Sequence, residues 1–259
     1  MKFLLREWRA LACAMQFLTR LPVATKTIFE SKDYANSLAW YPLVGVVLGF
    51  LIWLFGWALV DISSSALAAA LVLTLWVLLT GGLHLDGVAD CADAWVGGFG
   101  DREKTFQILK DPRSGPIAVV VLVLVLLLKW AALELLLNSP HWPIVGLIPV
   151  LARSAMPYIF WRLDYASASG LGSALVEGLC RRRILMSLLS VVGALALVLA
   201  AQLDILLLLV AVSVAIYLLW KRASYQRLGG FNGDCAGALV EFLELGLLLG
   251  LGIYTGLSL

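Results

Sequence analysis

Long apolar runs recur along this chain, and most of them approach the ~20 residues that a helix needs to cross a bilayer. This feature constrains the fold more than any other. The chain has 259 residues, of which 62% are hydrophobic and 14% charged, whereas about 25% of residues are charged in an ordinary soluble domain. The sequence therefore predicts an all-α integral membrane protein that forms a single polytopic domain over residues 1–259.

The apolar runs predict about seven transmembrane helices, with one further helix on the membrane surface. Residues 7–21 have the amphipathic character of an interfacial helix. Only Gln202 and Asp204 separate the fifth and sixth runs. No small-residue cleavage site follows the first apolar stretch, so we expect no removable signal peptide. The predicted spans are 38–60, 64–83, 116–137, 142–161, 184–201, 205–220 and 236–257.

The basic residues predict the orientation. All but two of the 19 Lys and Arg residues precede the first span or lie in three longer loops, and the three short connections on the other side hold none. By the positive-inside rule, the N-terminus and the polar loops 84–115 and 221–235 are cytoplasmic, and the C-terminus is outside. The two exceptions, Lys129 and Arg153, fall inside spans. We expect them to pair with a carboxylate such as Glu134 or to extend toward the membrane surface.

Several function classes are excluded by what the chain contains. A formal net charge of +2 is too small to indicate a nucleic-acid partner. The sequence has no GxxxxGK[ST], GxGxxG, HExxH or GxSxG motif, which removes the P-loop, Rossmann, zincin and hydrolase classes. The four cysteines lie far apart without a CxxC pair, which indicates neither a zinc site nor a disulfide framework. They are Cys13, Cys91, Cys180 and Cys235.

Three aspartates stand out in the segment HLDGVADCADAW, residues 84–95. Asp86, Asp90 and Asp93 are spaced i, i+4, i+7, which places all three carboxylates on one face of a helix that continues from an apolar span. Their mutual repulsion needs a partner. Mg²⁺ commonly binds through a few carboxylates together with substrate phosphate oxygens, so we predict a magnesium site on this face.

The same segment allows a plainer interpretation. The aspartates could instead bond to backbone amides or to loop arginines, which would make them structural. His84 could contact a metal or a phosphate, although a single histidine at a helix end is more often an interfacial residue. Gly87 permits close approach of a backbone or a ligand.

Two further polar motifs lie on the same predicted side of the membrane. KDPRSGP at 110–116 places Asp111 and Arg113 in a turn, where the arginine suits a bidentate phosphate contact or serves only as a positive-inside anchor. LGGFNGDCAGALVEFLE at 228–244 opens a span with glycines, Asn232 and Asp234. Glu241 should lie about 10 Å into that helix, where an unpaired carboxylate is costly and therefore indicates function.

Acidic groups for a metal, basic and glycine-rich groups for phosphate, and a membrane scaffold together indicate phosphoryl transfer from a nucleotide-activated donor. TGGLHLDGVADCADAW at 80–95 resembles the signature of the cobalamin synthases, the adenosylcobinamide-GDP ribazoletransferases of vitamin B12 assembly. FLTRLPV at 17–23, YPLVGVVLG at 41–49, KDPRSG at 110–115 and LGGFNGDCAGALVE at 228–241 resemble further family blocks in the same order. The chain departs from the family pattern at Ala94, Pro112 and Asn232.

The resemblance implies a bacterial inner-membrane enzyme that joins adenosylcobinamide-GDP to α-ribazole or α-ribazole 5′-phosphate and releases GMP. The attacking group would be the ribose 5′ oxygen or the phosphate of the acceptor. Mg²⁺ is the implied cofactor, and a homo-oligomer or cytosolic enzymes of the same pathway are the implied partners. The predicted catalytic residues are Asp86, Asp90, Asp93, Asp234 and Glu241; the substrate-binding residues are His84, Gly87, Asp111, Arg113, Gly115, Asn232 and Gly233; the metal ligands are Asp86, Asp90, Asp93 and Asp111.

Two other functions stay open at this stage. The DGxxDxxD spacing partly matches the aspartate motif of the CDP-alcohol phosphotransferases, which make phospholipids, but the longer extension of that motif is missing here. A transporter would use the charged residues inside the membrane to line a path. Transport predicts two related halves with broken helices, and the polar motifs of this chain instead crowd one side.

Overall fold

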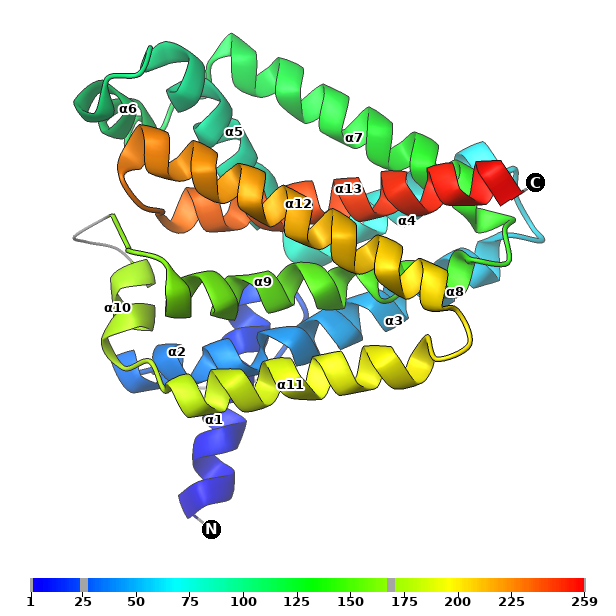
Figure 1. Cartoon of the computed structure of the whole chain (residues 1–259), viewed down its shortest axis with the longest axis horizontal. Helices are drawn as coiled ribbons and strands as arrows, with labels where there is room; N and C mark the ends of the chain where they lie inside the picture. The colour runs from blue at the N-terminus through cyan, green and yellow to red at the C-terminus, as the bar shows by residue number, and fades with distance from the viewer. Residues whose placement is uncertain (1, 24–27, 167–170, 259) are drawn as a thin grey trace.

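The computed structural model describes residues 2–23, 28–166 and 171–258, and every regular element within these ranges is a helix (Figure 1). This confirms the predicted all-α class. The first half of the chain forms α1 (Lys2–Leu18), α2 (Ser31–Ser37), the 3₁₀ turn η1 (Leu38–Trp40), α3 (Tyr41–Leu59), α4 (Ser65–Thr80), α5 (Leu83–Gly97) and α6 (Arg102–Leu109). The second half forms α7 (Pro116–Leu137), α8 (Trp142–Val145), α9 (Ile148–Arg162), α10 (Leu171–Glu177), α11 (Arg181–Val198), α12 (Leu203–Leu228) and α13 (Gly233–Ser258).

Each predicted span corresponds to a helix or helix pair. The match is closest at α7, which has the predicted bounds, and loosest at α12, which runs eight residues past the predicted end and makes most of the expected loop 221–235 helical. Within the described ranges, five helices are long and apolar enough to cross a membrane, or six if the bent pair α4–α5 is one span. The predicted span that falls outside this set is α11, which begins with three arginines.

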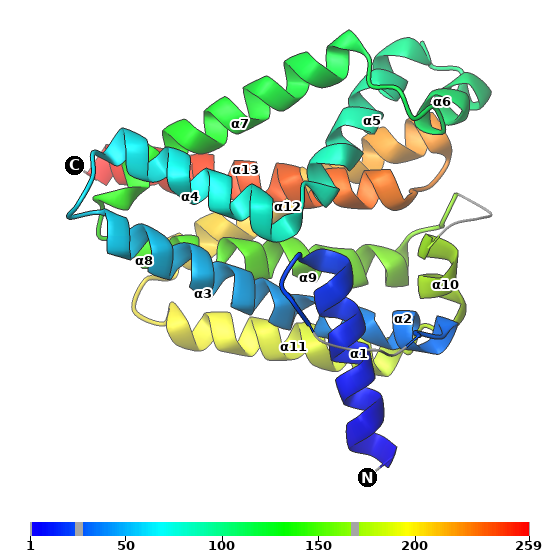
Figure 2. The same cartoon turned by 180° about the vertical axis from the view of Figure 1, so that it is seen from behind.

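The sequence suggested that the helix carrying the aspartates continues straight from the preceding span. The structure shows that it does not. α4 and α5 meet at an angle of 89°. The break falls at Gly81 and Gly82, whose φ angles of 64° and 70° lie in the left-handed region that glycine adopts without strain. α5 therefore starts toward the middle of the bundle and runs obliquely to one end (Figure 2).

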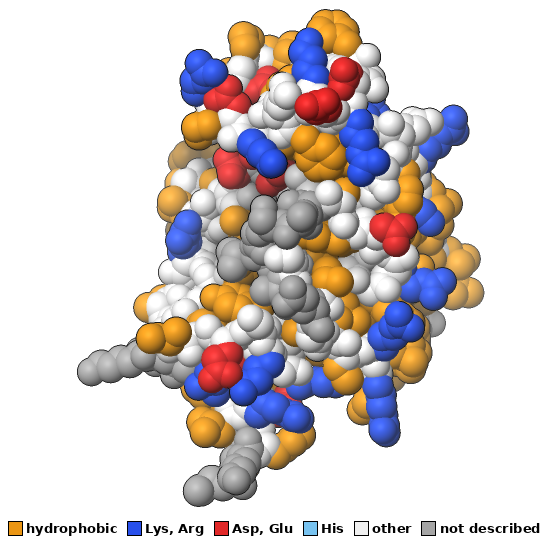
Figure 3. All heavy atoms as spheres, turned by 90° about the vertical axis from the view of Figure 1, so that its left-hand side faces the viewer, with side chains coloured by type: hydrophobic (Ala, Val, Ile, Leu, Met, Phe, Trp, Pro, Cys, Tyr) orange, Lys and Arg blue, Asp and Glu red, His pale blue; other side chains and the backbone are white. Residues whose placement is uncertain are grey.

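The two ends of the bundle differ in composition. The α5–α6 segment, α10 and the α12–α13 connection share one end, and the three short connections and the C-terminus lie at the other (Figures 1 and 2). Lys and Arg side chains are spread across the first end (Figure 3). α1 runs across the bundle, the direction expected of a helix parallel to the membrane surface, and it begins earlier than the predicted 7–21.

α5 and α13 pack against each other more closely than a side chain would allow at one point. An added Cβ on Gly87 would lie 2.6 Å from the carbonyl oxygen of Asp234 and 3.2 Å from the amide nitrogen of Ala238. The buried thiols of Cys91 and Cys235 face each other 3.8 Å apart at the same interface. This contact brings the first aspartate motif of the sequence against the last polar motif.

Candidate active site

A cavity of about 320 Å³ opens where α5 meets α13. It lies between the start of α5, the start of α13 and the last part of α9, so that three distant parts of the sequence form one site. The cavity is lined by six of the predicted site residues, together with apolar and aromatic neighbours. The six are His84, Asp86, Gly87, Asn232, Gly233 and Asp234.

The carboxylates at this cavity carry unbalanced negative charge. Asp86 lines the cavity and is exposed, whereas Asp90, one turn further along α5, is partly buried and lies outside the lining. Neither side chain makes a hydrogen bond or ion pair within the described residues. The charges of Asp86, Asp93 and Asp234 all act on Asp90. No Lys or Arg is found among the described residues that line the cavity. Such an arrangement attracts a cation, or a cation bound to a phosphate.

Asn232 fixes the position of Asp234. Its side-chain oxygen accepts a hydrogen bond from the amide of Cys235 at 2.9 Å, which is the geometry of an N-cap for α13. Its side-chain nitrogen donates to Oδ2 of Asp234 at 2.8 Å. One amide therefore starts the helix and holds the carboxylate beside the cavity. This explains in physical terms why a polar residue is needed at this position.

His84 is buried, with 1% of its surface exposed, and both ring nitrogens lack a hydrogen-bond partner within the described part of the chain. The interfacial interpretation of this histidine is wrong, because the bend at Gly82 turns it into the bundle. It lines the cavity and also interacts electrostatically with the buried charges of Arg153, Glu244 and Lys129. Buried polar atoms normally have partners, so this side chain is available to a ligand or a water molecule in the cavity.

Asp93 has a structural role that matches the plainer interpretation of the aspartates. Its two carboxylate oxygens accept hydrogen bonds from the amides of Gly115 at 2.5 Å and Ala118 at 3.0 Å. These are orphan donors at the start of α7, which has no cap of its own. Asp93 thus caps α7 from α5, and Gly115 is the residue that lets the carboxylate approach.

Asp111 and Arg113 form an exposed pair outside the cavity lining. The Arg113 Nε and Nη2 atoms donate to the two carboxylate oxygens of Asp111 at 2.9 and 2.7 Å. This side-chain pairing lowers the pKa of Asp111 to about 2 and raises the pKa of Arg113. Both groups are therefore charged at neutral pH, and because the pair is exposed, an anion can compete with Asp111 for the guanidinium.

Glu241 lies two turns into α13, as expected, but it does not face the cavity lining. It belongs to a buried cluster in which Lys129 Nζ donates to Glu241 at 2.5 Å and to Glu244 at 2.6 Å. Arg153 pairs with the other oxygen of Glu244. Two cations and two carboxylates from α7, α9 and α13 thus balance each other.

The expected partner of the two buried cations was wrong. Glu134 lies on α7, partly buried, and its contact is with the hydroxyl of Ser65 at 3.5 Å. The sequence held a signal for the correct pairing, because Glu241 and Glu244 are the carboxylates that fall deep inside an apolar span, three residues apart on one helix face. Tyr165 and Phe160 also line the cavity, and neither was expected there.

The available carboxylates are too few to enclose a metal ion completely, but they are enough for Mg²⁺, which also binds water and substrate oxygens. In the described ranges, no group of three or more His, Cys, Asp or Glu side chains is arranged to hold a metal ion by itself. Asp86 and Asp90 are the unengaged members of the predicted set, since Asp93 caps α7 and Asp111 binds Arg113. Mg²⁺ usually binds through one or two carboxylates, waters and substrate phosphates, so these residues fit it.

The fold and the site define a class: a polytopic helical membrane protein with an acidic cavity at its basic end, suited to phosphate-bearing substrates. The comparison with protein families gives the particular member of that class. The profile described as cobalamin-5-phosphate synthase matches residues 10–252, and the chain belongs to this family.

Curated relatives named adenosylcobinamide-GDP ribazoletransferase match along nearly their whole length. The relative from Ectopseudomonas mendocina (strain ymp) is 49% identical over 240 residues, which cover 93% of this chain and 97% of the relative. The relative from Pseudomonas entomophila (strain L48) is 50% identical, with the same two shares. The relative from Pseudomonas aeruginosa (strain UCBPP-PA14) is 47% identical over 247 residues, 95% of this chain and 98% of the relative. No solved structure matches this chain.

Proposed function

We propose that this protein joins adenosylcobinamide-GDP to α-ribazole 5′-phosphate, or to α-ribazole, and releases GMP. The observation that carries the proposal is the acidic cavity of Asp86 and Asp234, which has no basic residue in its described lining and occurs in a chain that shares about half of its residues with the named transferases. An acidic cavity can bind a phosphorylated donor when a divalent cation bridges the carboxylates and the phosphate oxygens.

The name of the family corrects one detail of the expected chemistry. A product that is a 5′-phosphate retains the phosphate of its acceptor, so neither that phosphate nor the 5′ oxygen is the attacking group. Another ribose hydroxyl must attack the cobinamide-linked phosphorus. A new phosphorus–oxygen bond forms, the bond to the bridging oxygen breaks, and GMP leaves with that oxygen.

A hydroxyl nucleophile needs a group that accepts its proton, and we assign this role to Asp234, which lines the cavity. Asn232 donates to its Oδ2 at 2.8 Å, and its other oxygen has no hydrogen-bond partner among the described residues. His84, buried with two unpartnered nitrogens, would orient a phosphate or hydroxyl at the inner end. Arg113 would exchange Asp111 for a phosphate oxygen of the donor when the substrate arrives.

Asp86 and Asp90 would hold Mg²⁺ at the mouth of the cavity. When bound, the ion would neutralise charge on the diphosphate and on the departing GMP. The described lining of the cavity supplies no Lys or Arg, and the Arg113 guanidinium is paired with Asp111. We therefore expect turnover to depend on the divalent ion.

The test uses protein reconstituted in liposomes with adenosylcobinamide-GDP and α-ribazole 5′-phosphate, with Mg²⁺ or with a chelator. Mass spectrometry should detect GMP and the joined corrinoid only when Mg²⁺ is present. Asp86→Asn should remove most of the product. Asp61→Asn, in the connection at the opposite end of the bundle, is the matched control and should retain it. Full turnover by Asp86→Asn at saturating Mg²⁺ would refute the metal assignment.

The same assay separates the alternative functions. Release of CMP from a CDP-linked donor would indicate phospholipid synthesis. Flux of a substrate into the liposomes without covalent change would indicate transport. Membership of the synthase family favours the transferase over both.

We further propose that the protein lies in the bacterial inner membrane with the cavity end toward the cytoplasm. The support is the concentration of basic side chains at that end (Figure 3). Cys180 is an exposed cysteine at the same end, while Cys13, Cys91 and Cys235 are buried. A membrane-impermeant maleimide should label Cys180 in inverted vesicles and spare it in intact spheroplasts. The converse pattern would reverse the orientation.

A further inference from the structure

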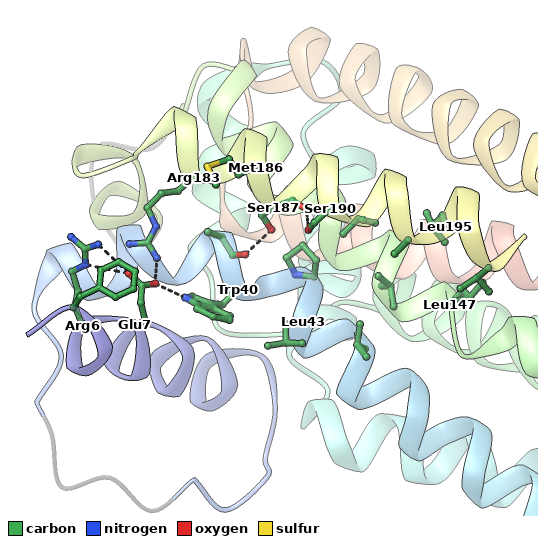
Figure 4. A pocket seen from close by; sticks show the side chains of 18 residues that line it. Arg6, Glu7, Trp40, Leu43, Leu147, Arg183, Met186, Ser187, Ser190 and Leu195 are labelled. Atoms are coloured by element: carbon green, nitrogen blue, oxygen red, sulfur yellow. Dashed lines mark hydrogen bonds and ion pairs between the residues drawn. The ribbon is translucent and has the colours of Figure 1, made fainter. Parts of the chain in front are cut away.

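A second and larger cavity lies away from the aspartates, along the outer face of the bundle. It has a volume of about 770 Å³ and runs between α3, α9 and α11, with α1 at one end (Figure 4). Its walls are apolar for most of their length, from Met186 and Leu43 to Leu147, Leu195 and Val198. We call this cavity the outer groove. None of the predicted active-site residues lines it.

One end of the outer groove is charged. Arg6 Nη2 lies 3.1 Å from Oε1 of Glu7, and Arg183 Nη2 lies 2.5 Å from Oε2 of the same carboxylate. Arg183 also donates to Asn36 at 2.7 Å, and the indole of Trp40 donates to Glu7 at 3.3 Å. Figure 4 shows Arg6, Glu7, Trp40 and Arg183 gathered at the α1 end, with the apolar walls leading away from them.

The charges at this end do not cancel. Two guanidinium groups share a single carboxylate, which leaves one net positive charge among the three side chains. Arg6 is 52% exposed and Arg183 21% exposed, so both can reach an additional anion. The outer groove therefore offers a positive group at its mouth and an apolar channel behind it.

The channel is longer than the hydrocarbon of one membrane leaflet, which is about 15 Å thick. Along α11, from Arg183 to Val198, fifteen residues extend about 22 Å. The hydrocarbon core of a bilayer is about 30 Å thick, so the channel runs from the level of a headgroup past the middle of the core. An amphipathic molecule matches this groove when its anionic head can lie at the charged end and its long apolar chain can lie in the channel.

We propose that the outer groove is a binding site for an anionic phospholipid, with the phosphate at Arg6 and Arg183 and one acyl chain along α3 and α11. Arg6 and Arg183 are the two cations among the described residues that line the groove, whereas Arg9, on the same helix, lies outside the lining and is paired with Asp33 at 2.5 Å. A zwitterionic lipid carries no net charge and gains less from this site. The inference does not depend on the proposed reaction.

The test measures which lipid stays on the protein. Full-length protein is reconstituted in vesicles of phosphatidylglycerol and phosphatidylcholine in equal parts, extracted in mild detergent and weighed by native mass spectrometry. We expect retention of phosphatidylglycerol over phosphatidylcholine, and loss of that preference by about fivefold for each arginine removed. Arg6→Gln with Arg183→Gln removes both contacts. Lys221→Gln with Arg222→Gln is the matched control, since it removes two exposed charges from α12 at the same end.

The arginine variants also remove the ion pair between Arg183 and Glu7 that joins α11 to α1, so a second pair of variants tests the groove while leaving that ion pair in place. Ala194→Trp fills the outer groove and should displace the lipid, whereas Ala196→Trp places the same side chain outside the lining of the groove and should not. Equal retention of both lipids, or retention unchanged by Ala194→Trp, would overturn the proposal. A dimer mass without lipid that is lost in Ala194→Trp would also overturn it, because the occupant would then be a second copy of the chain.

Discussion

α13 carries two acidic regions that differ in one respect, the presence of counter-charges. At its start, Asp234 faces the cavity together with Asp86, and no basic residue balances them in the described lining. About 10 Å further along the same helix, Glu241 and Glu244 are buried against Lys129 and Arg153. The residue types are nearly the same, but the first region is incomplete without a ligand and the second is complete within the chain.

The difference shows how a membrane protein can use carboxylates in two ways. A buried carboxylate is tolerated when a cation and hydrogen bonds compensate for its lost water. A carboxylate at a cavity keeps part of its solvent, and a ligand can supply the counter-charge that the chain does not. We therefore expect substitutions in the two regions to divide between stability and activity.

Glu244→Gln should have the largest effect on folding. It leaves Arg153 without a counter-ion in a site where the Nε and Nη2 atoms already lack partners. Loss of one member of a buried ion pair costs about 3–5 kcal/mol in the free energy of unfolding. Thermal unfolding in detergent measures this, with Glu134→Gln as the control on a partly buried carboxylate that has no cation partner. Equal stability of the two variants would show that the cluster is not a structural unit.

Asp234→Asn should show the opposite behaviour. The amide keeps the contact with Asn232 and removes charge that acts against Asp86, so stability should be unchanged or higher. Loss of a general base lowers kcat by about 10²–10⁴-fold. GMP release under saturating substrates measures the effect. A stable variant with normal kcat would leave Asp234 without a role in the reaction.

Gly87→Ala probes the contact between the two helices. The added methyl group would lie 2.6 Å from a backbone oxygen of α13, so the helices must separate. Overpacking of this kind costs about 1–3 kcal/mol, and activity should fall with it because Asp86 moves relative to Asp234. Gly256→Ala on α13 is the control, since nothing lies within 4 Å of its added Cβ. A Gly87→Ala variant as stable and active as this control would contradict the close packing.

Substitutions at Asp93 should have the smallest effect on stability, and they distinguish a helix-capping role from a metal-binding role. Asparagine has a single acceptor oxygen, so it can keep only one of the two amide hydrogen bonds that Asp93 accepts, whereas alanine loses both, and loss of a cap to alanine costs about 1 kcal/mol. If Asp93 only caps α7, both variants should keep turnover, and Asp93→Asn should lose less stability than Asp93→Ala. Loss of turnover in Asp93→Asn with normal unfolding would restore Asp93 to the metal site. Unfolding curves and GMP release on the same preparations decide between them.

Hydropathy was sufficient to predict most of the fold. The bounds of α7 and the depth of Glu241 in α13 follow from runs of apolar residues that must cover about 30 Å of hydrocarbon. The placement of Asp86, Asp90 and Asp93 on one helix was also predicted, because the period of a helix is a local property. Asp86, Asp234 and Asn232 were correctly expected to share a region, since their segments were predicted to lie at one side of the membrane.

Features that depend on pairing between distant segments could not be predicted in the same way. Any of several carboxylates could neutralise Lys129, and hydropathy does not rank them. The cap that Asp93 provides for α7 depends on the angle of α5, and that angle comes from two glycines in the left-handed conformation. A pair of glycines after an apolar run is equally compatible with a simple helix end.

The buried ion cluster also determines the order in which the spans can pack during synthesis and membrane insertion. α7 and α9 are synthesised first, each with a single cation near its middle, and a charge at that depth costs about 2.5–3.5 kcal/mol on insertion scales. Both counter-ions, Glu241 and Glu244, belong to α13, which follows α7 and α9 in the chain. Until ribosomal synthesis reaches that helix, Lys129 and Arg153 have no carboxylate of the cluster to bind. A span that enters the membrane after α7 and α9 is therefore the one that completes their packing.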